Sequence, residues 1–121
     1  MSAVEVGGQG QGLRAASMTV ERLARSCGST AMVVCMHYAA AAVVEALGPR
    51  AAREAIAAGR HLTTLAFSEA GSRSHFWTPV STATSDGGDV LLDAHKSWVT
   101  AAGEADSYVS SRQHPACARP S

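Results

Sequence analysis

Residues 28–49 read GSTAMVVCMHYAAAAVVEALGP, and this stretch decides what kind of fold the chain can adopt. The Ser-Thr pair at 29–30 can cap a helix, and a Gly-Pro pair typically ends one, so the stretch predicts a helix over 29–47. After the cap only His37 and Glu45 are polar. A helix that is apolar nearly all round is expected to be buried on several sides.

The same apolar run also has to be considered as a membrane-spanning helix. It is slightly short for that role, six of its residues are alanine, and no Trp or Tyr residues flank it as interfacial belts. We therefore expect no membrane span. The helix instead requires neighbouring helices, which a short chain barely contains.

Further helices are expected on both sides of this one, and the hydrophobic period changes only beyond His61. Helices are expected over 19–27, where Thr19 can act as the cap, and over 50–59. From residue 61 the sequence HLTTLAFS (61–68) is rich in β-branched and aromatic residues, which predicts a strand.

Short strands are expected in the rest of the chain, four or five in all between residues 62 and 112. The DGGD stretch is typical of a hairpin turn, because Gly-rich pairs adopt the required backbone angles. Two strand pairs follow: 78–84 with 90–93 about the turn at 86–89, and 95–100 with 107–111 about the turn at 102–104.

The predicted fold class is therefore α+β, with helices first and an antiparallel β-domain second. We expect a partial helical domain over 1–61, a partial β-domain over 62–113 and an irregular tail over 114–121.

Composition limits both the stability and the partners of the chain. Hydrophobic residues make up 46%, but 24 of the 121 residues are alanine, and Leu, Ile, Val and Phe together number 21. Large apolar side chains supply most burial energy, so the core is thin. Ten acidic and ten basic residues cancel, which argues against nucleic-acid binding. The excess of Arg over Lys indicates GC-rich, bacterial coding.

The three cysteines, Cys27, Cys35 and Cys117, cannot all pair, and the N-terminus does not resemble a signal peptide. A cytoplasmic location is expected, with Cys27 and Cys35 as small buried apolar residues. No metal site is expected, because Cys35 and His37 fall on different helix faces and the histidines are scattered. The Gly-rich stretch 7–12 lacks the Lys-Ser/Thr of a phosphate-binding loop.

Two other segments are candidate binding elements. Residues 65–75, LAFSEAGSRSH, predict a strand that runs into a hydroxyl-rich loop, which is either an ordinary polar turn or a site for an anion such as pyrophosphate. In KSWVT (96–100), Trp98 and Thr100 are expected to share one face of a strand. They either pack across the sheet or contact an aromatic heterocycle.

Taken in order, several motifs between about Val6 and Arg112 resemble the acyl-CoA dehydrogenase family of flavoproteins. That family shows Gly-Gly-x-Gly, Glu-x-Leu-Ala-Arg, a long apolar helix ending in Leu-Gly, Thr-Glu-Pro-x-x-Gly-Ser-Asp, Gly/Ala-x-Lys-x-Trp-Ile-Thr, and Ala-Asp before a strand. The counterparts here are GGQG at 7–10, ERLAR at 21–25, LG at 47–48, SEAGSRSH at 68–75, AHKSWVT at 94–100 and ADSYV at 105–109.

The resemblance implies FAD as cofactor and oxidation of acyl-CoA thioesters to 2-enoyl-CoA. By position, Phe67 and Ser68 would contact the flavin ring, Trp98 would pack against it, and Thr100 would lie near flavin N5. Ser74 would contact the cofactor pyrophosphate and the CoA arm of the substrate. The resemblance also implies a homo-oligomeric full-length parent.

The resemblance also indicates which parts of the parent enzyme are missing. The family's catalytic base is a carboxylate of a C-terminal helical domain, and the chain ends before that domain, so no catalytic residue is nominated. Glu69 is interpreted as a structural carboxylate, and Ala70, Arg73 and His75 stand where the family has Pro, Gly and Asp. The chain is thus expected to be either a fragment of an acyl-CoA dehydrogenase or a non-catalytic, ligand-binding remnant.

Overall fold

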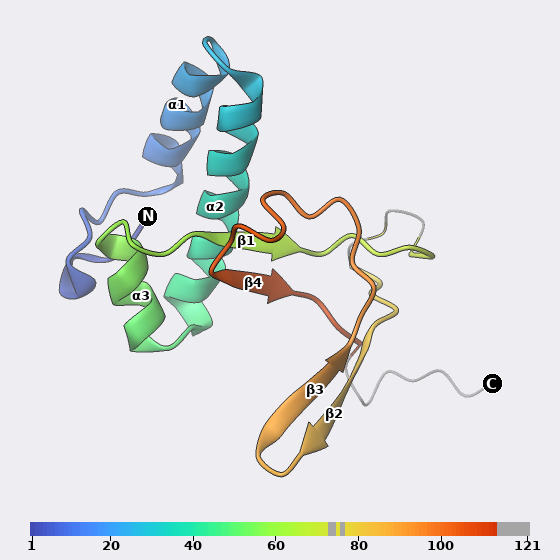
Figure 1. The fold of residues 1–121 in the computed structure, drawn as a ribbon. Coiled ribbons are helices and arrows are strands. Elements are labelled where there is room, and N and C mark those ends of the chain that lie inside the picture. The colour runs from blue at the N-terminus through green and yellow to red at the C-terminus, as the bar shows by residue number, and fades with distance from the viewer. Residues whose placement is uncertain (73–74, 76, 114–121) are drawn as a thin grey trace. The chain divides into compact units, whose positions relative to one another are not determined.

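The computed structural model describes residues 1–72, 75 and 77–113 (Figure 1). Helices precede strands, which confirms the α+β fold class, whereas the expected irregular tail over 114–121 lies outside the described residues. The elements are the 3-10 helix η1 (Val4–Val6), the helices α1 (Leu13–Ala24), α2 (Gly28–Leu47) and α3 (Arg50–Ala57), and the strands β1 (Thr63–Ala66), β2 (Thr82–Asp86), β3 (Asp89–Asp93) and β4 (Ser107–Ser110).

Contacts divide the chain into two compact units. The first contains Met1–Leu65 and Thr100–Val109, and the second contains Ala66–Val99 and the residues from Ser110 onward. The helices share their unit with most of β1 and β4, so the units do not coincide with the sequence ranges 1–61 and 62–113.

Helix α1 begins earlier than the sequence predicted. Its N-cap is Gly12, and Thr19 lies inside the helix instead of capping it. The Thr19 hydroxyl donates to the Ala15 carbonyl at 2.9 Å, which is the local bond that lets threonine reside within a helix. The helix ends at Ala24, before the predicted end.

Helix α2 matches its predicted range closely, but both of its ends differ in detail. Its N-cap is Cys27, whose sulfur accepts from the Thr30 backbone N–H at 3.5 Å. At the other end, a Cβ on Gly48 would lie 2.6 Å from Val44, so glycine is needed for close approach and not for a left-handed conformation. By length and composition α2 could cross a membrane, a test that core helices of soluble proteins also pass.

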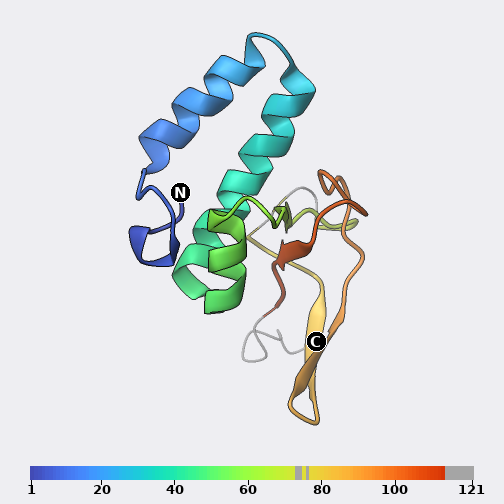
Figure 2. The same cartoon turned by 60° about the vertical axis from the view of Figure 1, so that its left-hand side comes forward.

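Helices α1 and α2 pack side by side as a hairpin, which Figure 2 shows with its short connecting loop. No residue of α1 is buried, and α2 buries only three alanines, Ala31, Ala40 and Ala41. Alanine carries little apolar area, so the core is as thin as the composition predicted. Large apolar side chains remain outside it, and Leu47 is 85% exposed.

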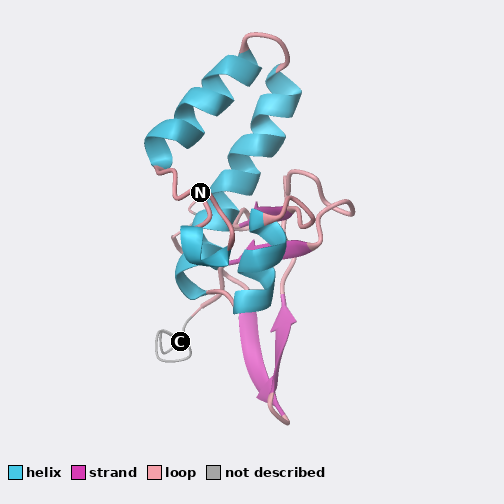
Figure 3. Cartoon of the chain, turned by 90° about the vertical axis from the view of Figure 1, so that its left-hand side faces the viewer, coloured by secondary structure: helices cyan, strands magenta, loops and turns pink. Residues whose placement is uncertain are grey.

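Strands β2 and β3 form the predicted antiparallel hairpin (Figure 3). Gly87 and Gly88 both have positive φ, 56° and 106°, as a tight hairpin turn requires. Pairing runs from Thr82 opposite Asp93 to Asp86 opposite Asp89, so β2 begins later than the predicted range.

The second predicted hairpin, 95–100 with 107–111, is wrong. Strand β4 pairs with β1 instead, and the arrows of the two strands point the same way in Figure 1, so this pair is not antiparallel as expected. The Ser107 backbone N–H donates to the Leu62 carbonyl at 3.3 Å. Residues 95–100 form no strand because Trp98 and Ala101 both adopt φ of 57°, which interrupts an extended chain.

Candidate functional site

The second unit contains a buried ion pair between Glu69 and Lys96. The Lys96 ammonium donates to Glu69 Oε1. The Glu69 side chain is 1% exposed and the Lys96 side chain is 11% exposed. Burying two charges is costly unless each also has hydrogen-bonding partners. Both residues meet that condition.

Backbone groups complete the bonding of both charges. The second carboxylate oxygen of Glu69 accepts from the backbone N–H groups of Val80 and Ser81, at 2.5 and 3.1 Å. The Lys96 ammonium also donates to the Ser111 carbonyl at 2.7 Å. We call these five residues the Glu69–Lys96 cluster, and it connects four separate chain segments.

The hydrogen bonds of the cluster keep Glu69 ionised. Burial alone would raise the pKa of the Glu69 carboxyl, but hydrogen bonds from Lys96 and Ser81, and from the Val80 backbone, outweigh burial and lower this pKa to about 2. A carboxylate with such a low pKa does not accept a proton near neutral pH. The structure thus shows a carboxylate engaged in hydrogen bonds, the arrangement that the interpretation of Glu69 as a structural carboxylate requires.

The cluster joins the two segments that the sequence singled out. Glu69 and Lys96 form an antiparallel β-bridge, and the Ser97 backbone N–H donates to the Ser68 carbonyl at 2.9 Å. Phe67 and Ser68 are therefore held close to Trp98 by backbone geometry. These are three of the residues to which the resemblance assigns flavin contacts.

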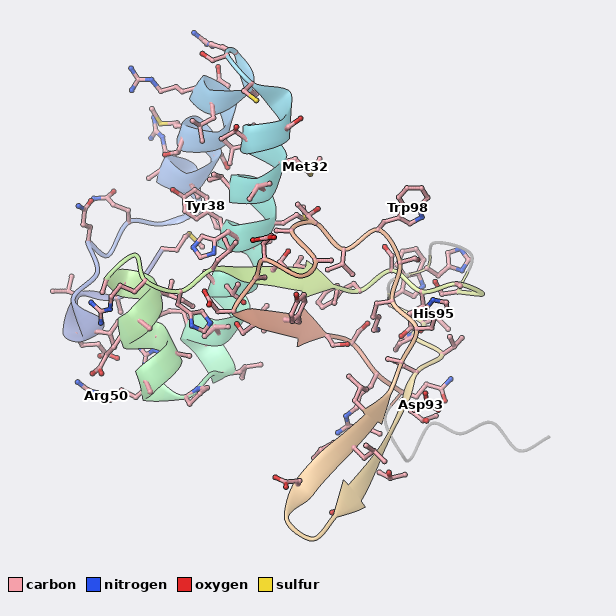
Figure 4. The ribbon with its side chains drawn as sticks, in the orientation of Figure 1. Met32, Tyr38, Arg50, Asp93, His95 and Trp98 are labelled. Carbon is pink, nitrogen blue, oxygen red and sulfur yellow. The ribbon has the colours of Figure 1, made fainter. Side chains whose placement is uncertain are left out.

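The side chains of these residues differ in exposure. Trp98 is 94% exposed, and its indole extends away from the backbone in Figure 4. Ser68 is exposed and Phe67 is half-buried. The indole does not pack across a sheet, so it is available to an external partner.

The remaining two predicted site residues are placed differently. The prediction that Trp98 and Thr100 share a strand face is wrong, because Trp98 lies in a bend and Thr100 begins a turn. Thr100 belongs to the first unit. Ser74, the expected pyrophosphate and substrate contact, lies outside the described residues.

The two cysteines in the described part of the chain, Cys27 and Cys35, differ in their exposure. Cys27 is exposed, so its expected burial is wrong, and a hydrogen bond from the Thr30 side chain lowers the pKa of its thiol. Cys35 is half-buried on α2. Over residues 1–72, 75 and 77–113, no group of His, Cys, Asp or Glu side chains could hold a metal ion.

Sequence reasoning missed a second polar contact, which lies in the first unit. His61 Nε2 lies 2.8 Å from the Ser107 hydroxyl oxygen. The Ser107 hydroxyl donates to the Thr63 hydroxyl at 2.9 Å. No spacing rule links residues so far apart in the chain, and the missed pairing of β1 with β4 is what brings them together.

Comparison with known proteins adds no assignment: no family model matches the chain, and no curated protein matches it.

Proposed function

We propose that the chain is an internal fragment of an FAD-dependent acyl-CoA dehydrogenase, an oxidoreductase that converts acyl-CoA thioesters to 2-enoyl-CoA. The observation that carries this proposal is the joining of two motif segments, 67–69 and 96–98, by the Glu69–Lys96 cluster. Segments that build one cofactor wall must lie together, and the Ser97 to Ser68 backbone bond brings them together.

The exposed residues at this junction fit one face of a flavin. The Trp98 indole offers an exposed flat apolar surface, and the exposed Ser68 offers a hydroxyl that can donate a hydrogen bond. Phe67 would contact the ring, Thr100 would lie near N5, and Ser74 would contact the pyrophosphate and the CoA arm. When bound, the flavin supplies the acceptor for substrate hydride.

Among the described residues of the two motif segments, the side chain that could act as a carboxylate base is already engaged in hydrogen bonds. Glu69 is the carboxylate within these segments, and its oxygens are occupied by Lys96 and by two backbone N–H groups. General-base catalysis typically contributes roughly 10²–10⁴ in rate. The isolated chain should therefore not oxidise acyl-CoA.

The isolated chain should also bind FAD weakly, because ligand sites normally bury most of the ligand and this junction offers one wall. The test is to mix the purified chain with excess FAD, pass it over a desalting column, and record the visible spectrum and the activity on a panel of acyl-CoA thioesters. Free flavin and no turnover are expected. A retained stoichiometric flavin, or turnover, would contradict the proposal.

Weak flavin binding can be assigned to the junction with matched tryptophan variants. Quenching of flavin fluorescence in a titration should diminish in Trp98→Ala and persist in Trp77→Ala, since Trp77 is also exposed, at 66%, in the same unit. Equal quenching by both variants would remove the flavin assignment of Trp98.

The alternative function is a non-catalytic ligand-binding remnant. The absence of buried residues in α1 favours this alternative, because such a helix gains little from packing in the chain alone. The coding region after Ser121 separates the two. A four-helix segment with an inward Glu that restores FAD retention on co-expression supports the fragment, and a region without one supports the remnant.

A further inference from the structure

One face of the α1–α2 hairpin, within the first unit, is left uncovered. Leu13 at the start of α1 is 72% exposed, and Val20 on the same side of the helix is only half-buried. No residue of α1 is buried, although its apolar side chains recur at helical spacing. Helix α1 therefore presents an apolar stripe that the described part of the chain does not bury.

A groove of about 400 Å³ follows this stripe between α1 and α2. Its α1 residues recur every three or four positions, so they share one side of the helix. From Leu13 to Glu21 the stripe rises about 12 Å, a little over two helical turns. Figure 4 shows Tyr38 on the α1 side of α2. The groove walls are mostly apolar, and the side chains that supply them are Leu13, Ala16, Val20, Cys35, Tyr38 and Ala39.

Arginines border the groove along α1. Arg14 and Arg22 each follow a groove residue in the sequence, about 100° further round the helix, and both are exposed. The C-cap residue Arg25 falls on the same side of the helix. Within the described part of the chain neither Arg14 nor Arg22 has an acidic partner, whereas Glu21 pairs with Arg25 at 2.7 Å. Since α2 contains no Asp, Glu, Lys or Arg before Glu45, the border of the groove has a net positive charge.

We propose that this groove binds an amphipathic helix of another polypeptide, one whose apolar stripe is bordered by acidic side chains. The apolar stripe of such a helix fills the groove, and its acidic border complements the arginines. A second copy of the chain does not supply this helix, because α1 and α3 each contain more Arg than Glu. The acidic residue of α2, Glu45, already pairs with Arg53 at 2.6 Å. The groove contains none of the residues assigned to flavin, so the proposal does not depend on the proposed function.

The test is a titration of the full chain into a fluorescein-labelled synthetic peptide, followed by fluorescence anisotropy. The peptide has roughly 18 residues, long enough to form a helix, with leucines at helical spacing bordered by glutamates. A peptide with the same leucines bordered by lysines is the control. Saturable binding of the glutamate peptide is expected, weakened severalfold by raising NaCl from about 0.05 M to about 0.5 M. No saturable binding, or equal binding of the lysine peptide, would overturn the proposal.

Charge variants and a lining variant locate the binding. The double variant Arg14→Glu, Arg22→Glu changes only exposed positions and should weaken binding of the glutamate peptide roughly tenfold while strengthening that of the lysine peptide. Arg60→Glu, on an exposed position of the same unit outside the groove, should bind as the parent chain does. Ala16→Glu, which places a charge in the apolar wall, should also weaken binding once circular dichroism shows that it folds. Unchanged affinity in the double arginine variant would overturn the proposal.

Two other occupants of the groove would give different results. A lipid surface would appear as binding to phosphatidylcholine vesicles that contain phosphatidylglycerol, without binding of the glutamate peptide. A second copy would appear in analytical ultracentrifugation as a dimer that the glutamate peptide does not dissociate. Either result would overturn the proposal.

Discussion

Replacing Glu69 by glutamine should destabilise the second unit strongly. Glutamine keeps the size of the side chain and removes its charge, so the change isolates the electrostatic part of the Glu69–Lys96 cluster. The Lys96 ammonium would keep its bond to the Ser111 carbonyl but lose its buried counter-charge. An uncompensated buried charge is the costly outcome of such a substitution.

The magnitude follows from burial. With side chains only 1% and 11% exposed, the pair falls in the class for which loss of one partner costs about 3–5 kcal/mol. Domains of this size are typically stable by about 5–15 kcal/mol, so the loss is a large fraction of the total. The matched control is Glu21→Gln, whose partner Arg25 lies at 2.7 Å with side chains 64% and 74% exposed, and which should cost about 0.3–0.5 kcal/mol.

The assay is urea unfolding followed by tryptophan fluorescence, because both tryptophans lie in the second unit. A Lys96→Met variant and the double variant complete a mutant cycle that measures the coupling between the charges. If Glu69→Gln lowers the free energy of unfolding no more than Glu21→Gln does, the burial argument fails.

The same pair predicts a pH dependence. The pKa of Glu69 is lowered from its usual 4.5 to about 2, so its stabilising contribution is complete above 4.5 and is lost as the pH falls toward 2. Glu69→Gln should lack this loss. Parallel acid-unfolding curves for the two proteins would contradict the assignment.

Three further outcomes are expected. The Thr64 hydroxyl is buried without a hydrogen-bond partner in the described part of the chain, so Thr64→Val should raise the free energy of unfolding in urea by about 1 kcal/mol. The control is Thr63→Val, which loses the hydroxyl bonds to Ser107 and should lower the same free energy by about 1 kcal/mol. The exposed Cys27 thiol, whose pKa is lowered by the Thr30 side chain, should react with iodoacetamide faster in the parent chain than in Thr30→Val, as peptide mass spectrometry would show. Burial lowers the pKa of His37 below 6.5, so just below pH 6.5 the unfolded chain binds a proton that the folded chain does not. The free energy of unfolding in urea should therefore decrease as the pH falls below 6.5, and it should decrease less in His37→Gln.

Local sequence signals predicted the helices and the first hairpin well. The Gly-Pro pair that ends α2 and the DGGD turn both act within a few residues, where backbone preference decides the structure. The start of α1 was missed because Thr19 has two options: it can cap a helix, or it can bond to the Ala15 carbonyl within one.

The second hairpin failed for a non-local reason. Its turn was identified near residues 102–104, but the chain before it leaves the extended conformation at Trp98 and Ala101. Strand β4 pairs instead with β1, which is far from it in the sequence. Strand propensity does not specify a partner, so the sequence predicts that a strand exists more reliably than what it pairs with.

The candidate site shows the same division. Sequence by itself determined the order of helices and strands, the thin alanine core, and the two motif segments that contain Ser68 and Trp98. Tertiary structure alone decided that those segments meet, because the Glu69–Lys96 ion pair and the bonds to Ser111 join residues far apart in sequence. Only in the folded chain is water removed from these charges, and that removal makes their partners obligatory.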